Sequence, residues 1–407
     1  MGKIMKTRIK IIEVRNNEEV SAKLILETIK NKEIVYITKN NKKINQSIYQ
    51  INFEGPAIIL NSSGSTNKKK KCIHSINNIT ASAKASGIWL EDLGIELRNC
   101  IIFNTLPLNH ISGLMPLWRS RIWNCNYTNI SPELIKNTEE LIKKTIFIKG
   151  KSKKYLITSL VPTQLYRLLS VETGIYWLKL FDVIWVGGAS ISNKISEKCR
   201  AEKIKLSPCY GATETSAMIT CLKPNDFLKG YDNAGKALSD INLRISKQGL
   251  IEVQSKRIGK ELVNFSKFKS FKDKDEWWSS SDLGEIININ HEEYLKVYGR
   301  IDNAFNSGGE TIFPDLIKSR IKEFVIEEEI PIDNLMLKIV KDDMWGNRYV
   351  LILYFKKNTN TKIMIDSLNK LKNYSDLWPK HERPLKWEIN NEDEKIELKV
   401  KNWKKYY

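Results

Sequence analysis

The chain has 407 residues, of which 42% are hydrophobic, and its formal net charge at pH 7 is +19. This length predicts two or three domains, and the composition excludes a chain that is disordered throughout. Apolar runs stay short of 18 residues and charges interrupt the N-terminal segment, so we expect neither a membrane span nor a signal peptide.

Charge and cysteine content bear on partners and location. Lysine, asparagine and isoleucine are abundant throughout, so codon bias is the first explanation of the positive charge. Small anionic ligands are compatible with it, whereas the scattered lysines and the lack of a nucleic-acid module argue against nucleic acid. Six cysteines without a C-x-x-C pair and only four histidines favour reduced thiols in the cytoplasm over disulfides or zinc. The sequence indicates no oligomeric state.

The chain begins with a predicted strand-helix-strand within residues 1–55. Modest apolar runs at residues 9–14 and 34–37 lie among charged residues. This region contains no motif that suggests chemistry.

The segment of residues 61–71 is the most distinctive, because it contains hydroxyls, one glycine and a run of four lysines. The apolar run 57–60 predicts a short buried strand before it, and Ile73, Ile76 and Ile79 follow at helical spacing, so we expect a strand-to-helix loop. Hydroxyl, N–H and ammonium groups can hold a polyphosphate. The second glycine and the Gly-Lys-Ser/Thr ending of a Walker A loop are missing. A lysine-rich surface turn is the alternative.

Strands and helices then alternate. The predicted segments are strands at 101–110 (ending in a proline turn and an exit at 111–114), 155–158, 181–186 and 205–210, and helices from after Leu114 through Trp118, at 162–169 and at 193–202. This pattern predicts an α/β fold with a largely parallel sheet covered by helices. Ligands bind at the carboxyl ends of such strands, where loops rich in glycine or hydroxyl groups follow at 187–190 and 211–215.

The last third of the chain has a different texture. Short strands between residues 232 and 289 predict a small β subdomain, and two helices and two strands between 315 and 371 predict a small α+β domain. We therefore expect a large N-terminal domain of residues 1–301 and a small C-terminal domain of residues 302–407.

Four stretches in this order, residues 62–71, 210–215, 281–284 and 299–314, resemble the adenylate-forming superfamily of acyl- and aryl-CoA ligases. The resemblance covers about residues 55–320. It implies a two-step reaction with ATP and Mg²⁺: a carboxylate attacks the α-phosphate to give an acyl-adenylate, and CoA then displaces AMP. It also implies that the C-terminal domain is mobile and rotates between the steps.

Within that superfamily, the sequence is most similar to the o-succinylbenzoate–CoA ligases of menaquinone and phylloquinone synthesis. The similarity rests on Ser63-Gly64-Ser65-Thr66, on residues 159–165 and on the short chain. Small-molecule substrates, namely an aromatic carboxylic acid, ATP and CoA, follow from it. Two rivals stay open: a CoA ligase for another aromatic or fatty acid, and a nucleotide-binding regulator that has lost catalysis.

The resemblance also implies an ATP site. The residues it assigns to ATP are Ser62, Ser63, Gly64, Ser65, Thr66 and Lys70 for the β- and γ-phosphates, Gly187, Gly188, Ala189, Tyr210 and Gly211 around the adenine, Thr213 at the α-phosphate, and Asp282 and Arg300 at the ribose. Each has a simpler interpretation; Tyr210 could be a core aromatic residue, Asp282 a turn or cap residue, and Arg300 half of a surface ion pair.

Catalytic and metal roles come from the same resemblance. Glu214 would bind Mg²⁺, and Thr213 would assist at the α-phosphate. His110 would gate the acid pocket, although a histidine at a strand end is often merely hydrogen-bonded. The remaining assignments are Lys395 as the catalytic lysine, Asp302 as the hinge, and Gly308 and Gly309 as CoA-binding residues.

Two departures from the superfamily pattern concern this chemistry. In the phosphate loop, Asn67, Lys69 and Lys71 replace a glycine, a proline and a second glycine. Asparagine tolerates positive φ, so the turn itself can survive. Near the C-terminus, Lys395 lacks the glycine that normally precedes the catalytic lysine, which leaves Lys399 as the second candidate.

Overall fold

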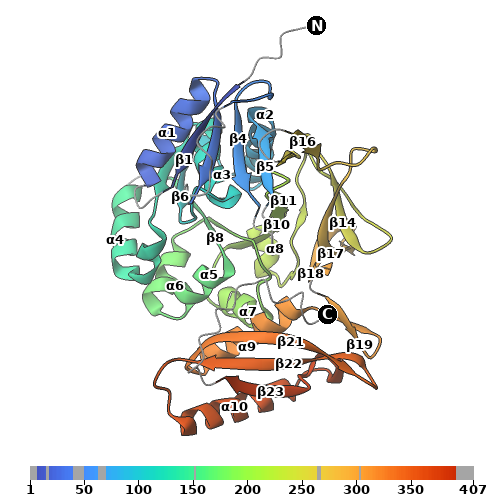
Figure 1. The fold of residues 1–407 in the computed structure, drawn as a ribbon. Helices are drawn as coiled ribbons and strands as arrows, with labels where there is room; N and C mark the ends of the chain where they lie inside the picture. The colour runs from blue at the N-terminus through green and yellow to red at the C-terminus, as the bar shows by residue number, and fades with distance from the viewer. Residues whose placement is uncertain are drawn as a thin grey trace. The chain divides into compact units, whose positions relative to one another are not determined.

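The computed structural model describes residues 7–14, 18–39, 50–62, 70–150, 153–263, 267–301 and 304–390 (Figure 1). The chain divides into two units, the first Met1–Ser280 with Gly284–Val297 and the second Ser281–Leu283 with Tyr298–Tyr407. None of the helices in the described ranges is long and apolar enough to cross a membrane.

The first sheet of the first unit has seven strands. In pairing order they are β16 (Lys267–Ser270), β15 (Lys260–Val263), β5 (Lys71–Ser75), β4 (Ala57–Asn61), β2 (Ile34–Thr38), β1 (Thr7–Glu13) and β3 (Gln50–Ile51). Strands β1, β2 and β4 run parallel, and β2 and β4 have the nearly continuous apolar sequences typical of buried parallel strands. The β5, β15 and β16 strands extend the sheet in antiparallel fashion.

The second sheet also has seven strands. In pairing order they are β12 (Lys236–Ala237), β11 (Ala217–Cys221), β10 (Leu206–Ala212), β9 (Val183–Val186), β8 (Tyr155–Leu160), β6 (Cys100–Asn104) and β7 (Asn126–Asn129). The five strands from β10 to β7 are parallel. The predicted helix-covered, largely parallel sheet is confirmed here.

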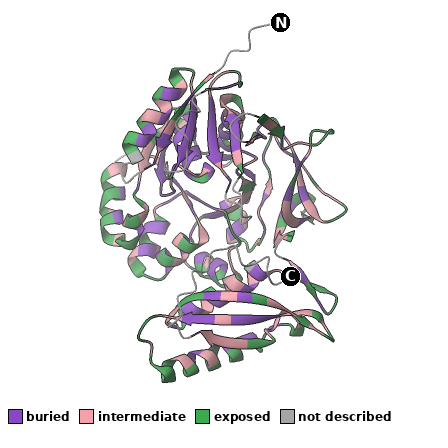
Figure 2. Ribbon diagram, in the orientation of Figure 1, coloured by how far each residue is buried: buried purple, intermediate pink, exposed green. Residues whose placement is uncertain are grey.

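Helices α2 (Ile76–Glu91) and α3 (Ile111–Trp123) lie between these two sheets. Ile79 of α2 packs against the first sheet with Leu114 of α3, whereas Trp89 and Leu90 of α2 pack against the second. Figure 2 shows the central strands as almost continuously buried. Ser75 caps the N-terminus of α2 in a capping box with Asn78, which fixes the point where strand becomes helix.

The other helices of the first unit cover the remaining faces. They are α1 (Glu18–Lys30), α4 (Thr138–Lys149), α5 (Pro162–Leu169), α6 (Glu172–Lys179), α7 (Asn193–Ala201) and α8 (Pro224–Leu228), with short 3₁₀ turns at Leu97–Asn99 and Pro132–Lys136. Residues of α4 to α8 form one core with the far face of the second sheet, around the fully buried Trp177. The helix predicted to begin at Pro162 and end at Leu169 is confirmed.

Short strands form a third sheet, in the pairing order β13 (Asn242–Ile245), β14 (Leu250–Gln254), β17 (Trp278–Ile289) and β18 (Glu292–Arg300). This is the small β subdomain that the sequence predicts.

The second unit contains β19 (Phe305–Ser307), β20 (Glu310–Ile312), β21 (Ile332–Asp342), β22 (Gly346–Phe355), β23 (Lys386–Asn390), α9 (Pro314–Glu327), α10 (Thr361–Ser375) and a 3₁₀ turn at Lys380–Glu382. The five strands of this unit form one sheet. The core of the unit lies between this sheet and helices α9 and α10.

One local prediction is wrong. Residues 61–71 do not connect a strand to a helix, because Lys71–Ser75 forms strand β5, which pairs antiparallel with β4 from Ala57 opposite Ser75 to Asn61 opposite Lys71. Ile73 therefore belongs to a strand, and α2 begins only at Ile76. Cys72, Ile73 and His74 are all buried, and β15 pairs with the other edge of β5. The spacing of Ile73, Ile76 and Ile79 therefore does not reflect a single helix.

Candidate functional site

The second sheet reverses its strand order beside β6. The chain places β7 on one side of β6 and then returns to place β8 on the other side. The loops that leave the carboxyl ends of β6 and β8 therefore diverge, and such a point is where α/β sheets bind ligands. His110 lies in the first loop and Val161 in the second.

Two hydroxyl and amide contacts hold these loops together. The Thr105 hydroxyl donates to the Ser159 carbonyl at 2.9 Å, and Gln164 Nε2 donates to the Thr105 carbonyl at 3.1 Å. Asn104 Nδ2 donates to the Leu106 carbonyl at 3.0 Å, which fixes the turn that leads to half-buried His110 at the start of α3. The switch point is therefore a rigid frame.

The predicted adenine-binding residues lie one strand further along the same edge. Gly187 follows β9, and a Cβ added to it would lie 3.0 Å from Cys209 Sγ, so the end of β9 touches β10 directly before Tyr210. Gly188 is exposed, with φ +88°, beside Val161 after β8. The structure thus brings Gly187, Gly188 and half-buried Tyr210 together, with exposed Ala189 next in sequence.

The turn of residues 212–217 carries Thr213 and Glu214. The Thr215 hydroxyl bonds to the carbonyls of Ala212 and Ala217, and Ser216 N–H bonds to the Thr213 carbonyl at 3.2 Å. Ser216 and Ala217 adopt φ values of 55° and 88°, which L-residues rarely populate. Such conformations persist only where the surroundings impose them, often at functional sites.

Gly211 is explained by packing at this turn. A Cβ at residue 211 would lie 2.2 Å from the Ala217 carbonyl oxygen and 2.5 Å from Met218 Cα. The strand pairing between β10 and β11 also shifts register at this residue. Gly211 therefore allows the close return of the chain after the Glu214 turn, and this structural role is sufficient to explain its identity.

The base of the phosphate loop is closed by hydrogen bonds. Buried Ser62 donates its N–H to the Lys70 carbonyl at 2.8 Å, and Lys70 N–H donates to Ser62 Oγ at 3.1 Å. Ser63, Gly64, Ser65 and Thr66, together with the altered Asn67 and Lys69, lie outside the described residues. The described part of the loop is thus the base of a β-hairpin.

Glu214 and Lys70 both affect the pKa of the Cys72 thiol of strand β5. Burial is the main cause of a strong rise in the pKa of the Cys72 thiol, and the Glu214 carboxylate raises it further. The Lys70 ammonium acts on the same thiol in the opposite direction. The Glu214 carbonyl also accepts the Gly259 N–H at 3.0 Å, beside the residues of β15 that pair with β5. The Glu214 turn therefore lies beside the end of strand β15 that pairs with β5.

His74 is a functional candidate that the sequence analysis missed. It is fully buried in β5, and its Nδ1 lies 3.0 Å from the Ser216 hydroxyl in the Glu214 turn. Burial lowers its pKa to about 4, and an interaction with the Thr213 backbone partly opposes this shift. A single histidine inside a short apolar run was the available signal.

The predicted ribose- and CoA-binding residues belong to the second unit. Asp282 lies within β17 and Arg300 ends β18, so Asp282 is neither a turn residue nor a helix cap. Gly308 and Gly309 have φ of +61° and +89° and form the two-residue turn between β19 and β20. That turn type requires positive φ at both central positions, which accounts for both glycines without a ligand. Asp302, Lys395 and Lys399 lie outside the described residues.

No metal centre built by side chains alone is present in the described ranges, where groups of three or more His, Cys, Asp or Glu side chains do not occur. Glu214 is a carboxylate on the turn that Ser216 and His74 connect to β5, the strand that follows the phosphate loop. Mg²⁺ fits this arrangement, since it is often held by one or two carboxylates together with substrate phosphates and water.

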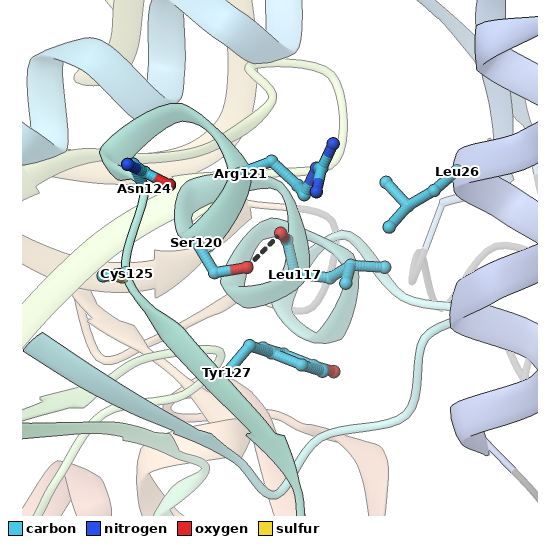
Figure 3. A pocket seen from close by; sticks show the side chains of 7 residues that line it. All are labelled: Leu26, Leu117, Ser120, Arg121, Asn124, Cys125 and Tyr127. Atoms are coloured by element: carbon cyan, nitrogen blue, oxygen red, sulfur yellow. Dashed lines mark hydrogen bonds between the residues drawn. The ribbon is translucent and has the colours of Figure 1, made fainter. Parts of the chain in front are cut away.

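A separate hollow of about 420 Å³ opens beside α3 (Figure 3). Its lining residues are Leu26, Leu117, Ser120, Arg121, Asn124, Cys125 and Tyr127. None of the predicted site residues lines it. In Figure 3 the Ser120 hydroxyl donates to the Leu117 carbonyl, at 2.8 Å, and so is engaged within its own helix. We assign the chemistry to the strand-end site and not to this hollow.

Comparison with known proteins identifies a family that matches most of this chain. The sequence profile of AMP-binding enzymes matches residues 4–263. A 2-succinylbenzoate–CoA ligase of Staphylococcus epidermidis is 28% identical over 320 residues, which are 76% of this chain and 61% of the relative. One of Listeria monocytogenes is 29% identical over 291 residues, which are 72% and 58%. The chain thus spans about three fifths of the length of these curated relatives.

A solved structure shows the same fold. It is o-succinylbenzoate CoA synthetase from Bacillus subtilis in complex with the acyl-adenylate intermediate, which superposes with a TM-score of 0.65 at 22% identity. The match covers 91% of this chain and 77% of that one. It confirms the α/β class and the arrangement of sheets predicted from the sequence.

Proposed function

The chain belongs to the AMP-binding enzyme family, and from this premise we propose that it is an o-succinylbenzoate–CoA ligase that uses ATP. The substrate assignment is supported by the names of the curated relatives and by the loop sequence Ser63-Gly64-Ser65-Thr66. The single structural observation that supports the proposal is the pair of hydrogen bonds that connect the Glu214 turn to Gly259 and to His74, beside the strand that follows Lys70. A polyphosphate with its metal needs a cation and a carboxylate in one site.

In the first half-reaction, a carboxylate oxygen of the succinyl group attacks the α-phosphorus of ATP. The bond from that phosphorus to its bridging oxygen breaks, and pyrophosphate leaves, giving the acyl-adenylate. Ser62, Lys70 and the loop between them bind the β- and γ-phosphates, while Thr213 donates to the α-phosphate. Tyr210 stacks on the adenine at the edge formed by Gly187, Gly188 and Ala189.

Mg²⁺ would be held by Glu214 together with phosphate oxygens, and when bound it supplies positive charge that offsets the phosphate charge. The acid pocket is placed at the switch point between β6 and β8. There the turn before His110 and the start of α5 are held rigidly through Thr105 and Gln164, and the frame would orient the carboxylate for attack. Lys395 would neutralise the attacking carboxylate.

In the second half-reaction, the CoA thiolate attacks the acyl carbon of the adenylate. The bond from that carbon to the phosphate oxygen breaks, AMP leaves with the oxygen, and a thioester forms. We assign Gly308, Gly309 and the hinge residue Asp302 to this step, together with rotation of a C-terminal domain beginning near residue 302. Asp282 and Arg300 would hold the ribose through their hydrogen-bonding groups.

The product would serve menaquinone or phylloquinone synthesis. The six free cysteines suit a reducing compartment such as the cytoplasm. Burial raises the thiol pKa of all six cysteines. A raised pKa makes a thiol a poor nucleophile. No protein thiol is therefore assigned a covalent role.

Pyrophosphate release on adding ATP, Mg²⁺ and one acid at a time tests the assignment. Release with o-succinylbenzoate, and not with benzoate or fatty acids, is the expected result. Release with a different acid would support a CoA ligase for that acid. If none of a broad panel of acids causes pyrophosphate release, a nucleotide-binding regulator without catalysis would be favoured.

A further inference from the structure

A buried hydrogen bond joins strand β5 to the Glu214 turn. His74 Nδ1 lies 3.0 Å from Ser216 Oγ, and the His74, Thr215 and Ser216 side chains are all fully buried. The pairing of β15 with β5 brings Gly259 opposite His74, where a Cβ would lie 2.6 Å from His74 Cε1. The histidine ring therefore fills a space that the absence of a side chain at residue 259 provides.

The direction of this bond follows from the proton count. Ser216 has a single hydroxyl proton, and Oγ donates it to the Arg257 carbonyl at 2.8 Å. The same oxygen can then only accept from the imidazole, so Nδ1 carries the proton. His74 Nε2 is left without a hydrogen, and within the described residues it has no hydrogen-bond partner. The ring is thus a neutral donor with a defined tautomer.

The bond acts on a strained segment. Ser216 and Ala217 have φ values of 55° and 88°, and the Ser216 carbonyl accepts from the Ser82 hydroxyl at 2.6 Å. Arg257 Nη1 donates to that Ser82 hydroxyl at 3.1 Å and to the Met218 carbonyl at 2.7 Å. The Ser82 and Arg257 side chains thus hold the backbone of the turn at Ser216 and Met218. The His74 side chain connects the Ser216 side chain to strand β5, which follows the phosphate loop.

We propose that His74 is a positioning residue for the adenylation step. Its Nδ1–H fixes Ser216 and thereby the turn that presents Thr213 and Glu214 to the nucleotide and its metal. This inference rests on the proposed function and adds a residue that touches neither ATP nor the acid. Groups that orient ligands from behind in this way typically contribute about 10–100-fold to activity or metal affinity.

Three variants separate positioning from bulk packing. In His74→Asn the amide nitrogen is bonded to Cγ, as Nδ1 is, so it can still donate to Ser216. In His74→Gln the nitrogen lies one bond further out, and in His74→Ala the donor is lost. Ile73→Val is the matched control, because it trims a buried neighbour in the same strand without touching the turn.

Single-turnover adenylation is measured against ATP and Mg²⁺ concentration. We expect His74→Ala and His74→Gln to lose about 10–100-fold in kcat/KM with a raised Mg²⁺ requirement. His74→Asn and Ile73→Val should stay within about threefold of wild type on the same scale. Ser216→Ala should add little to His74→Ala, because both remove the same bond. Wild-type activity in His74→Ala, or equal loss in Asn and Ala, would overturn the inference.

A second readout does not depend on turnover. The chain has four histidines, so ¹⁵N-histidine NMR can resolve the His74 ring. We expect a neutral Nδ1–H tautomer from pH 6 to 8 whose signal moves in Ser216→Ala. An Nε2–H tautomer, or an unchanged signal in that variant, contradicts the inference. If no acid supports pyrophosphate release by wild type, the proposed function fails, and the NMR signal still decides whether His74 holds Ser216.

Discussion

His74 Nδ1 lies 3.0 Å from Ser216 Oγ and connects two segments that are 142 residues apart in the sequence. One is the strand that follows the phosphate loop, and the other is the turn that carries Glu214. Parts of the ATP site that the sequence presents as separate motifs are therefore one mechanical unit. Predictions for this unit concern the metal ligand, the space around the histidine and its protonation.

Glu214→Gln keeps the shape of the side chain and removes its charge. If the carboxylate holds Mg²⁺, adenylation should fall by about 10²-fold or more while the melting temperature stays close to that of wild type. Glu261→Gln is the matched control, since Glu261 also acts on the Cys72 thiol but lies in β15. An active Glu214→Gln enzyme would place the metal elsewhere.

Gly259→Ala tests the space around the histidine. The added Cβ would lie 2.6 Å from His74 Cε1 and 2.7 Å from the Ile73 carbonyl oxygen. We expect destabilisation of about 1–3 kcal/mol in urea unfolding, as for other overpacked sites. The double variant Gly259→Ala/His74→Ala should lose less unfolding free energy than the sum of the two single losses. If the two losses are strictly additive, the added Cβ does not clash with the His74 ring.

Stability should depend on pH through His74. Burial lowers its pKa to about 4 from an ordinary value of 6.5, so the unfolded chain binds this proton more readily. The contribution is present in full above pH 6.5 and is lost as pH falls toward 4, by up to about 3 kcal/mol. Urea unfolding at pH 7.5 and 5.0 should therefore show a smaller pH effect in His74→Asn. Equal pH effects would contradict a buried neutral ring.

The two half-reactions should respond to different residues. Lys395→Ala should suppress acyl-adenylate formation by about 10²-fold or more and leave CoA attack on supplied adenylate nearly unchanged. Asp302→Pro should slow the second step, because a fixed φ hinders rotation at the hinge. Single-turnover kinetics of each half-reaction measures both. Normal adenylation by Lys395→Ala would move the role to Lys399, and an unimpaired Lys399→Ala would exclude a tail lysine.

The sequence predicted the second sheet well for a physical reason. Its central strands β6, β8 and β9 are largely buried and mostly apolar, and Pro162 and Gly187 mark where two of the strands end. The fate of residues 71–75 was not predictable in this way. A short apolar run suits helix and strand equally, and this run pairs with the preceding β4 on one edge and with β15, nearly two hundred residues later in the sequence, on the other.

The candidate site shows the same division. Motif residues such as Tyr210 and Glu214 could be proposed from the sequence because they belong to one short contiguous segment. His74 could not, because its role arises from a contact made by tertiary packing. Nor could the positive φ of Ser216 and Ala217, since neither residue type favours that conformation and only the surrounding bonds impose it.

Product identification tests the central claim most directly. The protein is incubated with o-succinylbenzoate, ATP, Mg²⁺ and CoA, and the mixture is analysed by mass spectrometry, with a parallel reaction that omits CoA. We predict o-succinylbenzoyl-CoA and an equal amount of AMP in the complete mixture, and the acyl-adenylate without CoA. Formation of ADP instead of AMP, or neither product with this acid while another acid yields its CoA thioester, would contradict the account.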